Sequence, residues 1–355
     1  MELRRVRLPL RHPHITATGT EADRDVVIVR VDEADGAVGW GECSALSAPT
    51  YTSEWTDGAW LVLRDHLVPA VLAGRPSGVR GHPMATAAVE TARLDAFCRR
   101  AGRSLAGHLG AARREVLSCT VVGLGRSVDE VLARVDGAPG PVKIKIAPGW
   151  DLEPLAAARA AWPDRFIAAD ANGTYDLDDP DHARALLALD DLGLAYLEQP
   201  TDPADLTAAA TAAGRLATPV ALDEALDAPG TVRTALALHA AGVVNLKPAR
   251  LGGPRAALEA ASLAAAAGVA VFVGGMLETG VGRAAALAVA SVLPGDLPTD
   301  LGPSDRYFAH DIVVPAVGAA SSAAHVCVPC GSGLGVDVDL ERLAACTTDV
   351  VELAR

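Results

Sequence analysis

The chain has 355 residues, and half of them are apolar, enough to bury a large core spread over roughly two domains. Its net charge of −13 argues against binding to nucleic acid or to an anionic membrane surface, and an anionic substrate would need a local positive site. No apolar run has the character of a signal peptide or a membrane span, and the six scattered cysteines are typical of thiols in a reducing cytosol. We therefore expect a cytoplasmic protein.

Of the 31 basic residues, 28 are Arg and only three are Lys, namely Lys143, Lys145 and Lys247. The property that Arg lacks is reversible deprotonation, because its pKa lies above ~12. We therefore predict that the three lysines stand where a proton has to move or where Arg does not fit.

Over residues 116–302, short apolar runs alternate with alanine-rich stretches. The runs predict strands at 117–122, 142–146, 166–170, 195–198, 220–223, 243–247 and 271–273, and a weaker eighth strand at 297–301. The stretches between them predict helices at 152–161, 183–189, 204–213, 231–240 and 255–267. This alternation is typical of an α/β fold with a parallel sheet, and seven or eight such units favour a closed barrel.

The flanking segments differ from this repeat. Expected strands at 3–8, 25–32 and 37–43 and expected helices at 53–66 and 86–100 indicate an α+β domain. The tail has short strands and turns, and we expect it to pack back on that domain. The predicted organisation is an α+β domain over 1–115, completed by 303–355, and a (β/α) barrel over 116–302.

Charged side chains stand at or near the ends of five consecutive barrel strands, at Lys145, Asp170, Glu198, Asp223 and Lys247. Barrel active sites are built at this face, from the ends of several strands. Asp170, Glu198 and Asp223 would converge there, and a divalent cation would relieve the repulsion between them. A donor set of oxygen atoms favours Mg²⁺, with Mn²⁺ as an alternative.

The lysines are expected to flank this metal site. Lys143 and Lys145 are two residues apart on one strand and so share a face, where crowding is expected to lower their pKa values. Lys247 follows with three strands between them, on the far side of an eight-stranded barrel. The pattern predicts a small-molecule carboxylate on the metal, with a lysine on each face of its α-carbon.

The order Lys-x-Lys, Asp, Glu, Asp-Glu, Lys resembles the muconate-lactonizing subgroup of the enolase superfamily, and the resemblance covers nearly the whole chain. Residues 39–42 (GWGE) and 49–52 (PTYT) are similar to its capping domain. Residues 274–283 (GGMLETGVGR), 304–308 (SDRYF) and 247–250 (KPAR) are similar to the branch of o-succinylbenzoate synthases and N-succinylamino acid racemases. The resemblance implies a (β/α)7β TIM-like barrel, with an α+β capping domain from the N-terminus and the C-terminal tail.

The resemblance also implies roles for individual residues. Asp170, Glu198 and Asp223 would bind Mg²⁺, Lys145 would be the general base, Lys143 its electrostatic neighbour and Lys247 the opposing lysine. Asn172, Glu224 and Arg250 would support these groups from behind. The residues expected around the substrate are Gly19, Thr20, Tyr51, Gly274, Gly275, Met276 and Glu278. For Glu278, a carboxylate at the start of a helix is an equal alternative.

The activity that the resemblance implies first is that of an o-succinylbenzoate synthase, a lyase that dehydrates a cyclohexadiene carboxylate in menaquinone biosynthesis. The alternative is an N-succinylamino acid (N-acylamino acid) racemase, followed by a dipeptide epimerase, a muconate cycloisomerase and a non-catalytic barrel. Cys119, Val121 and Ala286 depart from the residues expected at specificity positions in this branch. The departures bear on the substrate and not on the reaction class. A homo-oligomer is expected.

Overall fold

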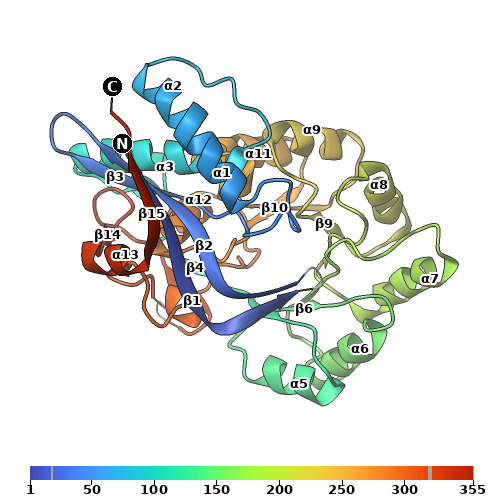
Figure 1. Cartoon of the computed structure of the whole chain (residues 1–355). Coiled ribbons are helices and arrows are strands. Elements are labelled where there is room, and N and C mark those ends of the chain that lie inside the picture. The colour runs from blue at the N-terminus through green and yellow to red at the C-terminus, as the bar shows by residue number, and fades with distance from the viewer. Residues whose placement is uncertain (17–18, 319–321, 355) are drawn as a thin grey trace.

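The computed structural model describes residues 1–16, 19–318 and 322–354, and for residues 14–16, 19 and 20 it describes the backbone alone. Figure 1 shows an antiparallel sheet with its helices on one side of the molecule and a curled parallel sheet with its own helices on the other. The two termini lie close together, because β1 and β15 are neighbours in the first sheet. None of the described helices combines the length and apolar character that a membrane crossing requires.

The first sheet has the order β15–β1–β2–β3, formed by β1 (Glu2–Thr16), β2 (Gly19–Asp32), β3 (Val38–Cys43) and β15 (Thr347–Glu352). Alternating residues of β2 face opposite ways, as the period of a strand requires. Val27 and Val29 pack in a core shared with the helices that follow, while Val26 and Ile28 belong to the core on the barrel side. The helical segments of this region are α1 (Thr56–Val62), a π-helical turn (Leu63–Leu67), α2 (Val68–Leu72), α3 (Pro83–Arg100) and α4 (Leu105–Leu109).

Gly39 and Gly41 allow α3 to lie directly on β3. A Cβ at Gly41 would meet Ala88 O at 2.0 Å, and one at Gly39 would meet Ala92 O at 2.0 Å. Backbone atoms cannot yield as a flexible side chain can, so an added methyl group would push the helix off the strand. The contact depends on both residues being glycine.

Gly41→Ala is therefore expected to lower the free energy of unfolding by about 1–3 kcal/mol, the usual cost of overpacking a core. Urea denaturation followed by circular dichroism measures this. Gly214→Ala is the matched control, because Gly214 lies in a helix with nothing within 4 Å of its Cβ position. That change is expected to be neutral or stabilising by up to ~1 kcal/mol. An unchanged midpoint for Gly41→Ala would contradict the prediction.

The second sheet is parallel and has seven strands in the order β11–β10–β9–β8–β7–β6–β5. They are β5 (Thr120–Val122), β6 (Val142–Lys145), β7 (Ile167–Asp170), β8 (Leu197–Glu198), β9 (Val220–Leu222), β10 (Val243–Leu246) and β11 (Ala270–Val273). The helices are α5 (Val128–Asp136), α6 (Leu152–Ala161), α7 (Pro180–Ala188), a 3₁₀ turn (Leu189–Leu192), α8 (Leu206–Arg215), α9 (Pro229–Ala237), α10 (Pro248–Leu251), α11 (Pro254–Ala266) and α12 (Gly280–Ala290). This confirms the predicted α/β barrel-like fold.

Two predicted strands differ from the structure. The run 117–122 is divided: β4 (Glu115–Leu117) pairs antiparallel with β13 (His325–Cys327) of the tail, and only β5 joins the barrel sheet. The predicted strand at 297–301 does not form. Its place is taken by Thr299 and Asp300. Asp300 N donates to Val273 O of the edge strand β11 at 3.0 Å, and Thr299 N donates to Leu117 O, in the segment that precedes the other edge strand, β5, at 2.8 Å. Two residues thus bridge the seam, where Pro298 removes a donor that a strand would need.

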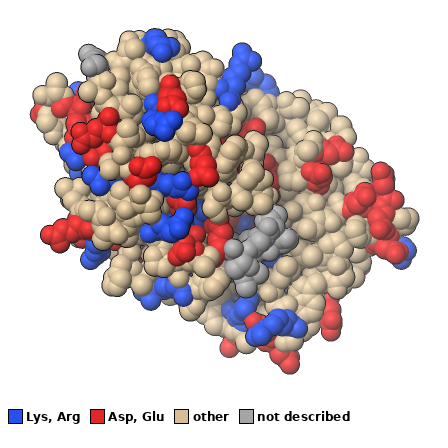
Figure 2. Space-filling model, viewed as in Figure 1, with Lys and Arg blue, Asp and Glu red and all other residues tan. Residues whose placement is uncertain are grey.

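The remaining elements belong to the tail. They are a 3₁₀ turn (Ser304–Arg306), β12 (Val313–Val314), β14 (Asp337–Val338), which pairs with β12, and α13 (Leu340–Cys346). β15 then adds to the edge of the first sheet beside β1. Figure 2 shows acidic and basic side chains of the described residues interspersed over one face of the molecule.

Candidate active site

The strand-end charges meet at one end of the curled sheet. Register places Lys145 opposite Asp170 and Asp170 opposite Glu198 on neighbouring strands, so the three side chains leave the sheet on the same face. Asp223 and Lys247 directly follow the last residues of β9 and β10. All six predicted lysines and carboxylates are buried, and none is more than 9% exposed. The prediction that they converge is confirmed.

Each lysine is paired with one of the three carboxylates. Lys143 Nζ lies 2.6 Å from Glu198 Oε2, and Lys145 Nζ lies 2.8 Å from Asp170 Oδ2. Lys247 Nζ lies 2.9 Å from Asp223 Oδ2. β6 and β10 stand on opposite sides of the strand order, so Lys145 and Lys247 approach the carboxylates from two directions.

Each ammonium also donates a hydrogen bond to a second partner, which is not one of the three predicted metal ligands. Lys143 donates to Asp300 Oδ2 at 2.6 Å, and Lys145 donates to Asn172 Oδ1 at 2.6 Å. Lys247 donates to the phenol oxygen of Tyr51 at 2.7 Å. Sequence reasoning placed Asn172 and Tyr51 at the site but missed Asp300. The available signal was the weakly predicted strand at 297–301, which contains this carboxylate near its end.

Arg250 contacts the carboxylate oxygen of Asp223 that faces away from Lys247's contact, Oδ1 in place of Oδ2. Its Nη1 lies 2.7 Å from Asp223 Oδ1 and donates to Tyr51 Oη at 2.6 Å, while its Nε donates to Leu226 O at 2.8 Å. Burial alone would raise the pKa of Asp223, but Arg250 and Lys247 outweigh it and hold this pKa below its usual range. Asp223 therefore stays ionised.

Burial and neighbouring negative charges raise the pKa values of two other carboxylates, Glu198 and Glu224. Burial raises the pKa of Glu198 well above its usual value, with Lys143 opposing the shift and Asp170 and Asp223 adding to it. Burial and the charge of Asp223 raise the pKa of Glu224 to about 6, and this carboxylate accepts a hydrogen bond from Asn172 at 2.8 Å. Like charges close together in a poorly solvated site resist ionisation, and a cation would remove that penalty.

The pKa of Lys143 does not follow the sequence-based expectation. Burial lowers it, but Asp300 and Glu198 outweigh burial and hold the pKa of Lys143 well above its usual value. The prediction that crowding by Lys145 lowers this pKa is therefore wrong for Lys143. Sequence spacing showed the two amines but not the carboxylate facing them.

The geometry of the predicted metal ligands is that of three carboxylates each bound to a lysine. In the part of the chain that the structure describes, no three His, Cys, Asp or Glu side chains are arranged to hold one metal ion. Instead, each of the three carboxylates predicted to bind the metal forms an ion pair with the ammonium group of a lysine. The chemistry of the donor set still fits a hard divalent cation, because three buried carboxylates repel one another and Asn245 orients one of them through Nδ2 to Glu198 Oε1 at 2.8 Å. Metal binding stays a prediction.

The segment 274–278, predicted to contact the substrate, passes beside Lys247 at its first residue. A Cβ at Gly274 would lie 2.8 Å from Lys247 Cε, so the backbone passes directly beside this lysine. Met276 is 5% exposed and packs in the core of the first domain. Glu278 is 2% exposed and lies 2.9 Å from Arg283 in the first turn of α12. The ion pair with Arg283 favours the helix-start alternative for Glu278 over a direct contact with substrate.

The first domain fixes that segment through two buried charges that sequence reasoning did not assign. Arg24 donates to Leu277 O at 3.2 Å and Met276 O at 3.3 Å, and Leu277 has a φ of +56°, which is strained for a residue with a side chain. Glu42 accepts hydrogen bonds at the start of α12, from Thr279 Oγ1 at 2.6 Å and Gly282 N at 3.0 Å. Burial raises the pKa of Glu42 to about 7.

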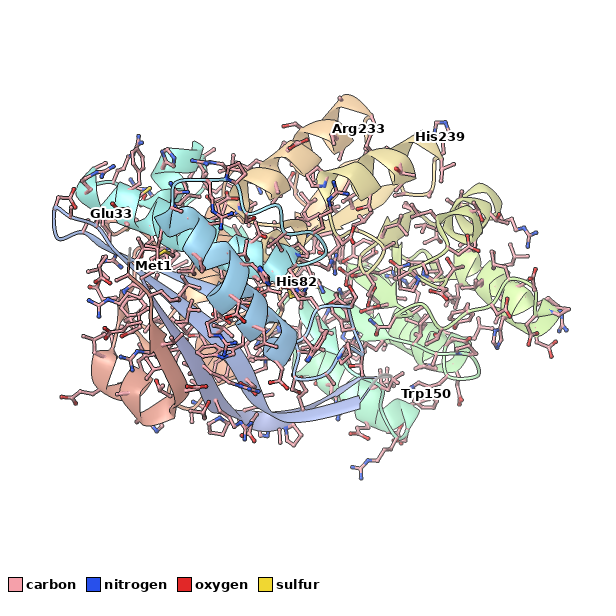
Figure 3. The ribbon with its side chains drawn as sticks, turned by 45° about the horizontal axis from the view of Figure 1, so that its top comes forward. Met1, Glu33, His82, Trp150, Arg233 and His239 are labelled. Atoms are coloured by element: carbon pink, nitrogen blue, oxygen red, sulfur yellow. The ribbon has the colours of Figure 1, made fainter. Side chains whose placement is uncertain are left out.

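The remaining predicted positions have different outcomes. Gly19 and Thr20 lie at the start of β2, but their side chains fall outside the described residues. In Figure 3 the far end of the β1–β2 pair points toward Trp150, which follows β6. Val121 pairs in register with Lys143, so the two side chains share a face of the sheet, and Val121 is 38% exposed. Cys119 and Ala286 are buried in the interior.

Comparisons with known proteins agree with this geometry. Residues 127–343 match the family described as "Enolase C-terminal domain-like", and residues 1–110 match "Mandelate racemase / muconate lactonizing enzyme, N-terminal domain". The chain is 40% identical to an N-succinylamino acid racemase of Amycolatopsis sp, covering 98% of this chain and 97% of the relative. It is 36% identical to an o-succinylbenzoate synthase of Geobacillus kaustophilus, covering 96% and 93%. A solved member of the enolase superfamily from Listeria innocua superposes with a TM-score of 0.93 at 34% identity, covering 99% and 98%.

Proposed function

Since the chain belongs to the enolase superfamily, whose enzymes generally use a divalent metal, we propose that it is a Mg²⁺-dependent o-succinylbenzoate synthase. The observation that carries the proposal is the pairing of three buried lysines with three buried carboxylates at one end of the barrel. Curated relatives named o-succinylbenzoate synthase, at 34–36% identity over most of the chain, support the choice of reaction.

Asp170, Glu198 and Asp223 would hold the metal, with Mn²⁺ as the alternative ion. When bound, the cation would neutralise the substrate carboxylate and favour the negative charge that develops on it. The charges of Lys143, Lys145, Lys247 and Arg250 are balanced by those of the four carboxylates Asp170, Glu198, Asp223 and Asp300. An anionic substrate of a chain with net charge −13 would therefore depend on the bound cation for a local positive charge.

Lys145 would remove the α-proton of the cyclohexadiene carboxylate, which gives an enediolate. The ammonium groups of Lys143 and Lys247 would lie beside the enediolate and stabilise its negative charge, by several kcal/mol in a site that holds little water. The β-hydroxyl group would then leave as hydroxide and take the proton from Lys145, so that water is released and the lysine is neutral again. Asn172, which accepts from Lys145 at 2.6 Å, would fix the direction of the amine.

Racemization of N-succinylamino acids is the second candidate. The specific observation that favours it is that Lys247 is as firmly held as Lys145: it contacts Asp223 at 2.9 Å and Tyr51 at 2.7 Å. Two oriented amines on opposite sides of one α-carbon are what a two-base racemization requires. The relative from Amycolatopsis sp named N-succinylamino acid racemase supports this alternative.

The metal assignment predicts that Asp170→Asn, Glu198→Gln and Asp223→Asn each weaken Mg²⁺ binding by ~10²-fold or more, because each removes ligand charge. Isothermal titration calorimetry with Mg²⁺ measures this. Asp181→Asn, an exposed carboxylate in α7, is the control and is expected to bind as the wild type does. Undiminished binding in any two of the three variants would mean that the metal lies elsewhere.

A homo-oligomer in the cytoplasm remains part of the proposal. Light scattering coupled to size-exclusion chromatography would give the oligomeric state directly.

A further inference from the structure

The ammonium of Lys143 is shared between two carboxylates. Its Nζ lies 2.6 Å from Glu198 Oε2 and 2.6 Å from Asp300 Oδ2, and Lys143 is only 3% exposed. Glu198 is assigned above to the metal, whereas Asp300 is not. One buried cation is thus held partly by a proposed metal ligand and partly by an anion outside the metal site.

Asp300 is firmly placed although it lies in no strand. Its backbone N donates to Val273 O at 3.0 Å, and the preceding residue, Thr299, accepts from Cys119 N at 2.6 Å. The Oδ1 atom of Asp300 is buried, and the described residues offer it no hydrogen-bond partner. The Oδ1 atom of Asp300 is therefore available to accept a hydrogen bond beside the Lys143 ammonium.

The other two lysines lack this arrangement. The second partner of Lys145 is the amide oxygen of Asn172, and the second partner of Lys247 is the phenol of Tyr51. Both are neutral in the pairing that the structure shows. If a cation binds the carboxylate that pairs with Lys145 or Lys247, the ammonium of that lysine is left with a neutral partner. Among the three second partners, Asp300 alone carries a negative charge that would remain with its lysine.

We propose that Asp300 is a positioning residue for the metal site: it holds the Lys143 ammonium on an anion that is not a metal ligand, so that Glu198 is free to bind a divalent cation. With Asp300 in place, the ammonium of Lys143 would keep a counter-ion while Glu198 serves as a ligand of the cation. Without Asp300, metal binding by Glu198 would leave the buried ammonium of Lys143 without a counter-ion. The free energy of that unpaired charge would weaken the binding of the metal. The inference rests on the proposed metal-dependent function.

The test is calorimetric titration of the wild-type protein and of Asp300→Asn with Mn²⁺ at one pH. The variant is expected to bind Mn²⁺ about 10–100-fold more weakly, the usual effect of removing a group that supports a metal ligand. Asp296→Asn is the matched control: Asp296 lies four residues earlier, is fully exposed and faces Arg113 at 3.5 Å. It is expected to bind Mn²⁺ as the wild type does.

A purely structural role for Asp300 is separated by removing the lysine. In a Lys143→Gln background no ammonium needs to be held, so Lys143→Gln/Asp300→Asn is expected to bind Mn²⁺ as tightly as Lys143→Gln alone. This pair removes both buried charges together and decides the matter even if Asp300→Asn by itself does not fold. An equal loss from Asp300→Asn in both backgrounds would overturn the proposal, as would wild-type affinity in the single variant. If the wild-type protein binds no Mn²⁺, the proposed function fails, and this inference fails with it.

Discussion

Lys145→Arg is expected to lower turnover by about 10⁴-fold or more while the protein remains folded. The guanidinium keeps the positive charge, but it does not lose a proton at accessible pH, so the α-proton has no acceptor. The site also restricts the larger group, because Lys145 is 8% exposed and its Nζ already lies 2.6 Å from Asn172 and 2.8 Å from Asp170.

Two measurements check this prediction. The first is the rate of dehydration of the cyclohexadiene carboxylate, and the second is exchange of the substrate α-proton in D₂O, which reports proton abstraction even where no product forms. Arg126→Lys is a control for the effect of exchanging the two basic residues away from the site, since Arg126 is 93% exposed. Substantial dehydration or wild-type exchange by Lys145→Arg would remove Lys145 from the role of base.

Lys247→Arg is expected to separate the two candidate reactions. In a dehydration that uses Lys145 alone, Lys247 only supplies positive charge, and Arg can do so imperfectly. The loss should then be ~10²–10⁴-fold, the scale of one misplaced catalytic group. In a two-base racemization Lys247 must itself take and give a proton, so the same change should abolish racemization in both directions. Crowding adds to the misplacement, because Arg250 already contacts Tyr51 and Asp223 on this side.

The measurement is α-proton exchange for each enantiomer of an N-succinylamino acid in D₂O, together with the dehydration assay on the same protein. Lys247→Arg should still exchange the enantiomer whose α-proton faces Lys145, without inversion. Lys145→Arg is the mirror control and should retain exchange of the other enantiomer only. Wild-type exchange of both enantiomers by Lys247→Arg would show that Lys247 is not a base. Dehydration without exchange of either enantiomer would leave the synthase as the sole function.

The first domain contacts the barrel at the segment beside Lys247. Sequence motifs placed residues 39–42 and 49–52 in a capping domain but gave no partner for any of them. In the structure Glu42 binds the start of α12, Arg24 binds the carbonyls of Met276 and Leu277, and Tyr51 reaches Lys247 and Arg250. The first domain is therefore tied to the barrel at the segment beside Lys247.

The sequence by itself determined the barrel class and the charged residues at the strand ends. One βα unit repeats every 24–28 residues between Lys145 and Lys247, so each charge returns to the same end of the sheet, and this local period is readable without the fold. The scarcity of lysine then singled out Lys143, Lys145 and Lys247 among 31 basic residues.

Only the tertiary structure decided which groups each lysine contacts. Asp300 is 157 residues from Lys143, and Tyr51 is 196 residues from Lys247, so no local period relates them. Asp300 stands at the seam where the predicted eighth strand does not form, and backbone bonds of Thr299 and Asp300 to the two sides of that seam bring it to Lys143. A side chain placed by closure of a barrel leaves no periodic signal, because its position depends on the sum of all the strands between it and its partner.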